Sequence, residues 1–120
     1  MSSRFDLDGE DLVIESRREG DTTVVALRGE VTVFSSPALR ERLHRIAGEH
    51  PGRIVMDLAE TTYVDSSGVA TFVEVLKMVR RHEGDLVLAG ISDRVRGVFE
   101  IARLADVFHM APSVEEALEP

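Results

Sequence analysis

The residues most able to carry chemistry are a carboxylate and two neighbouring hydroxyls, Asp65, Ser66 and Ser67, followed by Gly68. They stand between a short apolar block at 54–58 and a run with helical periodicity, which predicts a loop after a strand and then a helix start. Such loops face the carboxyl edge of a parallel sheet, where sites in open α/β folds gather. Free N–H groups at a helix N-terminus favour an anion. A plain helix N-cap suits the same residues, so both interpretations stay open.

Enzyme motifs that could use these residues are incomplete. A nucleophile elbow around Ser66 needs glycine at 64, where the chain has Val64, and no lysine-bearing phosphate loop occurs. Asp57 resembles the phosphate-accepting aspartate of a receiver domain but lacks the acidic pair that would hold magnesium. The histidines form no i, i+4 pair and are expected on the solvated surface: His44, His50, His82 and His109. The sequence therefore predicts neither a metal nor a cofactor.

The remaining chemistry is a hydroxyl that another protein modifies. A phosphoryl group on Ser66 would add about −1.5 to −2 charge and three acceptor oxygens to an exposed loop. On a contact surface, that change is a strong switch.

The elements expected to position these residues alternate between strand and helix. Strand-like runs at 12–14 and 22–27 around Gly20 predict an N-terminal β-hairpin, and the block at 54–58 predicts a central strand covered on both faces. Further strands are predicted at 85–90 and at Val107-Phe108. This order predicts a single α/β domain over residues 1–120, with a mixed, mostly parallel sheet and helices packed against it.

The predicted helices have recognisable starts. The first has Ser36 as its cap and Pro37 as its first residue. The long amphipathic helix runs from Gly68 to about His82, and the last two are capped by Ser92 and by Ser113 in a capping box. Residues 1–11 are acidic and are expected to form a loosely ordered N-terminus.

Composition excludes several classes of function. The 120 residues carry 14 Lys+Arg against 22 Asp+Glu, a net charge of −8, which opposes binding to nucleic-acid phosphates but is compatible with a basic patch on a partner. The absence of cysteine excludes disulfides and thiol chemistry. No signal peptide is recognisable and no apolar run approaches the ~18 residues of a membrane span, so a cytoplasmic protein is expected.

From Val24 to about Leu118 the sequence resembles the STAS domain, and within that family the stand-alone anti-sigma-factor antagonists of bacteria. Four segments carry the resemblance: Leu27-Arg28-Gly29-Glu30-Val31, Val55-Met56-Asp57-Leu58, Val64-Asp65-Ser66-Ser67-Gly68-Val69, and the 86–90 strand with 95–99 after it. The family usually has an aspartate at the position of Thr32, which keeps a hydroxyl but loses the charge.

The resemblance implies a switch with no catalysis of its own. Ser66 would be phosphorylated by a partner that is both anti-sigma factor and serine kinase, only the unphosphorylated form would bind it and free a sigma factor, and a serine phosphatase would reset the switch. The implied partner-binding residues are Thr32, Asp65, Ser66, Ser67, Gly68 and Val69. Gly68 is expected to admit a close approach of the partner backbone, although an ordinary role in the entry to the helix stays open. Alternative functions are a STAS scaffold or accessory subunit, as in stressosomes or lipid transport, and a small hydrolase using Ser66.

Overall fold

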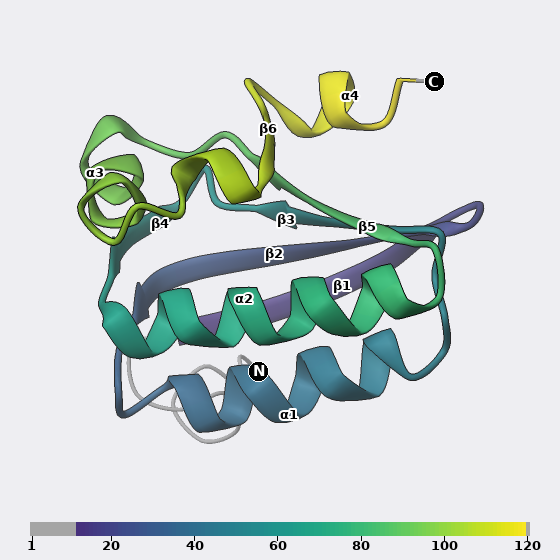
Figure 1. Ribbon diagram of the computed structural model, residues 1–120, viewed down its shortest axis with the longest axis horizontal. Helices are drawn as coiled ribbons and strands as arrows, with labels where there is room; N and C mark the ends of the chain where they lie inside the picture. Colours follow the sequence, from purple (N-terminus) through teal and green to yellow (C-terminus); the bar gives the residue numbers. More distant parts are fainter. Residues whose placement is uncertain (1–11, 120) are drawn as a thin grey trace.

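The sheet has the strand order β1-β2-β3-β5-β6, with β4 paired to β2, in the computed structural model, which describes residues 12–119 (Figure 1). The elements are β1 Leu12–Glu19, β2 Thr22–Val31, α1 Ser36–Ala47, β3 Arg53–Asp57, β4 Thr61–Val64, α2 Ser66–Arg81, β5 Asp85–Ala89, α3 Asp93–Ile101, the 3-10 turn η1 Ala105–Val107, β6 His109–Ala111 and α4 Val114–Ala117. Strand β1 is antiparallel to β2, whereas β2, β3, β5 and β6 are parallel. The predicted hairpin and mostly parallel sheet are confirmed, and Gly20 has a φ of +65° in the hairpin turn.

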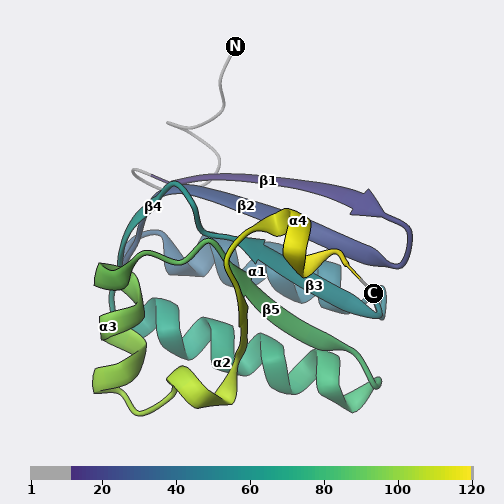
Figure 2. The same cartoon turned by 90° about the horizontal axis from the view of Figure 1, so that it is seen from above.

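Helices α1 and α2 cover one face of the sheet, and the short α4 lies against the other (Figures 1 and 2). Strand β3 lies between β2 and β5, where Ile54 and Met56 pack into the larger core with the helices. Val55 points the opposite way, into a smaller cluster with Ala117 of α4. The prediction of a central strand covered on both faces is therefore confirmed.

Strand β4 is not anticipated by the sequence pattern. The first half of β2 pairs with β3 and its second half pairs with β4, with an irregularity between Gly29 and Glu30. The hydroxyl of Thr61 donates to the carbonyl of Leu27 at 2.8 Å, which anchors the start of β4. Because β4 ends beside the end of β2, the backbone N–H of Asp65 donates to the carbonyl of Val31 at 2.9 Å.

Helix α2 begins two residues earlier than Gly68, at Ser66, because the side chain of Asp65 caps it. The predicted apolar face is buried, with Phe72 fully inside the core. The caps predicted downstream are confirmed: Ser92 Oγ accepts from Val95 N at 3.2 Å, and Ser113 Oγ accepts from Glu116 N at 3.1 Å.

Two local predictions are wrong. The last strand is β6, not Val107-Phe108: Val107 lies in η1, and Phe108 turns inward to meet the ring of Phe99 edge-on, with centroids 5.5 Å apart. An apolar pair predicts burial, but pairing with β5 decides which residues form the strand. Helix α1 is preceded by Ser35, and Ser36 is its first residue instead of its cap. The expectation for residues 1–11 lies outside the described residues.

Candidate functional site

The candidate site lies where β2, β4 and the N-terminus of α2 meet, at the carboxyl end of the parallel strands (Figure 1). The loop at 32–35 leaves β2 here and leads into α1. Asp65, directly after β4, faces both this loop and the first turn of α2. Two stretches that are distant in sequence, 31–35 and 61–68, are therefore held together at one edge of the sheet.

Asp65 is the hydrogen-bond centre of this edge. Its Oδ1 accepts from Ser67 N at 2.9 Å, from Gly68 N at 3.2 Å and from Ser67 Oγ at 2.5 Å. Its Oδ2 accepts from Val33 N at 3.0 Å, which ties the loop to α2. Partial burial pushes the pKa of Asp65 upward, but the hydrogen bonds from the Ser67 hydroxyl and the three N–H groups outweigh it and hold the pKa below its ordinary value. Asp65 is therefore both an N-cap and a clamp on the loop.

The two adjacent serines have different surroundings. Ser66 is exposed on the first turn of α2, and its hydroxyl makes no hydrogen bond with any residue in 12–119. Ser67 is half-buried, with its Oγ bonded to Asp65 and lying 2.8 Å from Ser36 Oγ on α1. An enzyme approaching this edge meets the hydroxyl of Ser66 free and that of Ser67 engaged.

Gly68 and Val69 lie inside the domain. A Cβ on Gly68 would stand 2.7 Å from a methyl of Val31 and 2.8 Å from a methyl of Val64, so the close approach here is made by the chain's own strands. This differs from the expectation that a partner backbone approaches Gly68. The side chain of Val69 is 3% exposed and belongs to the core. Both residues position α2 on the sheet and present no side chain to a partner.

Thr32 organises the loop. Its half-buried side chain accepts a hydrogen bond from Phe34 N at 3.2 Å, and its carbonyl accepts from the N–H groups of Ser35 and Ser36. This tight turn projects Val33 and Phe34 outward, with 60% and 76% of each residue exposed. Large exposed apolar side chains on a loop are typical of contact surfaces.

Val33 and Phe34 are the residues that reasoning from the sequence missed. Two large apolar side chains between a strand and a helix were the available signal, but the pattern alone did not show that they point away from the core. Together with Ser66 they form the loop–helix surface: Val33, Phe34 and Ser66 on a scaffold held by Asp65.

Of the four histidines expected on the solvated surface, His50, His82 and His109 are exposed, whereas His44 is half-buried. His50 and His82 stack on each other with ring centroids 3.6 Å apart, His44 Nε2 lies 2.9 Å from a carboxylate oxygen of Glu74, and His109 contacts Asp85. Within residues 12–119 no three His, Asp or Glu side chains gather as metal ligands. No helix in the same range has the length and apolar character required to cross a membrane.

The chain is similar to known proteins in sequence and in fold. The family model described as the STAS domain matches residues 13–117 of the chain. The chain belongs to the STAS domain family. Among its curated relatives, anti-sigma-B factor antagonists match this STAS chain: that of Bacillus subtilis is 30% identical over 106 residues, 88% of this chain and 96% of that protein. That of Staphylococcus aureus is 32% identical over 104 residues, 87% and 96% of the two chains, and that of Listeria monocytogenes is 32% identical over 93 residues, 78% and 82%.

Solved structures share the STAS fold. An anti-sigma factor antagonist from Mycobacterium paratuberculosis superposes with a TM-score of 0.82 at 19% identity, covering 89% of this chain and 91% of that one. The anti-sigma factor antagonist SpoIIAA in its unphosphorylated form gives 0.78 at 22% identity over 88% and 93%. The phosphorylated form of SpoIIAA gives 0.71 at 21% identity over 88% and 96%. At these identities the likeness establishes the fold alone.

Proposed function

We propose that this STAS protein is an anti-sigma-factor antagonist that acts by partner switching. Its unphosphorylated form binds an anti-sigma factor that is also a serine kinase, and this binding frees a sigma factor. Phosphorylation of Ser66 ends the binding, and a serine phosphatase restores it. The protein acts in the cytoplasm as a regulator, without catalysis, a cofactor or direct contact with nucleic acid.

The observation that carries the proposal is the surroundings of Ser66. Its hydroxyl is exposed and free at the start of α2, and the preceding Asp65 is hydrogen-bonded to Val33 in the loop that carries the exposed Phe34. A modifiable group next to apolar side chains lets one phosphate change the character of a contact surface. The antagonist names of relatives at about 30% identity favour the same function.

Electrostatics gives the switch its direction. The first turn of α2 offers N–H groups and a favourable helix dipole, so a phosphate on Ser66 is tolerated by the domain itself. Across an interface the same dianion lies beside the ionised Asp65, and burying it without a matched cation costs several kcal/mol. Phosphorylation therefore acts on binding and leaves the fold in place.

The hydrolase alternative finds little support at Ser66. A serine nucleophile needs a base within hydrogen-bonding reach, and the hydroxyl of Ser66 has no such neighbour in the described part of the chain. A scaffold or accessory subunit differs from a switch protein in a measurable way, because assembly into a complex does not require phosphate on Ser66.

The experiment has two stages. The tagged unphosphorylated protein captures its partner, and the purified partner is then incubated with the protein and ATP. We expect a single phosphoryl group on Ser66, located by peptide mass spectrometry, followed by release of the partner. Ser66→Ala should bind and not be released by ATP. Stable co-assembly with no phosphate in the presence of ATP supports the scaffold function and contradicts the switch.

A further inference from the structure

We infer that Ser36 and Asp65 hold the hydroxyl of Ser67 away from a kinase, so that this chain itself restricts phosphorylation to Ser66. The inference rests on the proposed function and adds a specificity-determining role for Ser36, a residue on α1 that is 31 positions from Ser67.

The contacts of Ser67 Oγ leave it little freedom. Asp65 Oδ1 lies 2.5 Å away, and an ionised carboxylate can only accept, so the single proton of Ser67 points toward Asp65. Ser36 Oγ lies 2.8 Å away, and its single proton is shared between the Ser67 oxygen and the carbonyl of Thr32, which is 2.7 Å from Ser36 Oγ. The proton of Ser67 is thus engaged by Asp65, and its oxygen is in contact with Ser36.

Ser36 is fixed in a place where it can hold this contact. It is only 6% exposed, and its own N–H donates to the carbonyl of Thr32 at 2.7 Å. Asp65 is fixed as well, by the N–H groups of Val33 and Gly68. Ser67 therefore sits between two anchored partners, the N-cap of its own helix α2 and the first residue of α1, and rotating its hydroxyl outward breaks both contacts.

Phosphoryl transfer requires a serine oxygen that is free to approach the γ-phosphorus of ATP, and these contacts restrain the oxygen of Ser67. The serine oxygen forms a bond to the γ-phosphorus of ATP, the bond from that phosphorus to the bridging oxygen breaks, ADP leaves, and the hydroxyl proton passes to a base of the kinase. The oxygen must approach the phosphorus in line with the leaving group. The free hydroxyl of Ser66 can do so by rotating its side chain, whereas that of Ser67 must first leave Asp65 and Ser36.

The test uses the kinase recovered in the experiment above, with ATP and peptide mapping. Wild type should carry phosphate on Ser66 alone, and Ser66→Ala should gain phosphate on Ser67 only slowly, at a small fraction of the wild-type rate on Ser66. Ser66→Ala/Ser36→Ala should gain phosphate on Ser67 at a rate about 5-fold or more above that of Ser66→Ala, because one hydrogen bond that holds the hydroxyl inward is lost. Ser66→Ala/Ser36→Thr, which keeps a hydroxyl, should return to the rate of Ser66→Ala. Ser66→Ala/Ser16→Ala, with a change at an exposed serine of β1, should match Ser66→Ala.

Two kinetic results overturn the inference. One is phosphorylation of Ser67 in Ser66→Ala at the rate that Ser66 shows in wild type. The other is no gain in a folded, kinase-binding Ser66→Ala/Ser36→Ala. A wild type that carries no phosphate at all contradicts the proposed function itself, which distinguishes the two failures.

A measurement on the wild-type protein covers the case in which the double variant does not fold. In proton NMR, the hydroxyl of Ser67 should exchange slowly enough to give a signal coupled to its own Cβ protons. A Ser67 hydroxyl that exchanges as fast as that of Ser66 contradicts the inference.

Discussion

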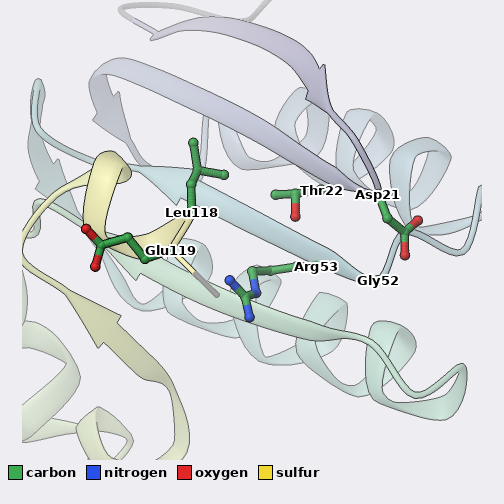
Figure 3. A pocket seen from close by; sticks show the side chains of 6 residues that line it. All are labelled: Asp21, Thr22, Gly52, Arg53, Leu118 and Glu119. Atoms are coloured by element: carbon green, nitrogen blue, oxygen red, sulfur yellow. The ribbon is translucent and has the colours of Figure 1, made fainter.

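The two ends of the parallel strands place polar groups differently. At the carboxyl end, Asp65 accepts from three backbone N–H groups and so ties a loop with two exposed apolar side chains to the start of α2, where Ser66 has a free hydroxyl. At the amino end, a pocket of about 370 Å³ is lined by residues from the hairpin turn, the start of β3 and the segment after α4 (Figure 3). There Arg53 donates to the carbonyl of Ala117 at 2.7 Å and fastens α4 to the sheet.

The carboxyl end of the strands exposes side chains that a partner can contact, whereas the amino end holds elements of the fold together. None of the exposed large apolar residues of the described chain lines the amino-end pocket, where Arg53 lies between the carboxylates of Asp21 and Glu119 on either side of the groove (Figure 3). Polar groups at that end complete the fold, whereas those at the carboxyl end present a surface. Changes at the carboxyl end should therefore alter binding, and changes at the amino end should alter stability alone.

The largest effect is expected from phosphorylation of Ser66. Affinity for the anti-sigma factor should fall about 100-fold or more, equivalent to ~2.7 kcal/mol, because a poorly paired dianion is buried beside Asp65. Ser66→Asp should lose part of the affinity, since it supplies one charge, and Ser66→Ala should keep it. Titration calorimetry measures the affinity of each form for the anti-sigma factor, and melting curves measure the stability of each form alone. A fall in melting temperature of more than ~10 °C on phosphorylation indicates loss of the fold. That result contradicts a switch that acts on binding and leaves the domain folded.

The second prediction concerns Gly68, which lies at the carboxyl end but is needed for packing inside the domain. Gly68→Ala should destabilise the domain by about 1–3 kcal/mol, because the added methyl meets Val31 and Val64 in a packed core. The control is Gly97→Ala in α3, where a Cβ meets no atom within 4 Å and should stabilise by about 0.4–1 kcal/mol. Urea unfolding measures both. Equal stability of the two variants contradicts the packing role.

These first two predictions show where the sequence sufficed. The periodicity of α2, the hairpin and the central strand are local patterns, and the exposed position of Ser66 follows from its place at the start of a helix. The role of Gly68 depends on Val31, 37 positions earlier, and no local pattern carries that information. A glycine at a helix start fits equally well with a close partner and a close strand.

Long-range pairing explains the other misses. Strand β4 has four residues, of which only Thr61 and Val64 are buried, too few to reveal a period of two. Its existence depends on the second half of β2 extending beyond β3. The same pairing brings Asp65 to Val33, and so decides that the loop side chains face solvent. The sequence could name the serine but not the apolar surface around it.

The third prediction separates the two ends directly. Phe34→Ala should weaken binding to the anti-sigma factor about 10-fold, the loss typical of an aromatic anchor, with an unchanged melting temperature because the side chain is 76% exposed. Arg53→Met should leave affinity unchanged and lower stability by about 1 kcal/mol through loss of the hydrogen bond to Ala117. Calorimetry and urea unfolding are run on both variants. Loss of affinity in Arg53→Met, or full affinity in Phe34→Ala, contradicts the division between the ends.

The smallest effect is a pH dependence from Asp65. Its pKa in the folded protein is below its ordinary value of about 4, so the unfolded chain binds the proton more tightly. The stabilisation from Asp65 is therefore complete above about pH 5 and is lost as the pH falls through the ordinary pKa toward the lower folded one. Asp65→Asn removes this titration, so the stability gap between wild type and variant should be widest near pH 6 and narrow by pH 3. Glu119→Gln, at the amino-end pocket, is the matched control for removing one carboxylate elsewhere on the protein. Urea unfolding at each pH measures the difference in unfolding free energy between wild type and each variant. A difference for Asp65→Asn that stays constant with pH shows that the charge of Asp65 does not contribute to holding the loop.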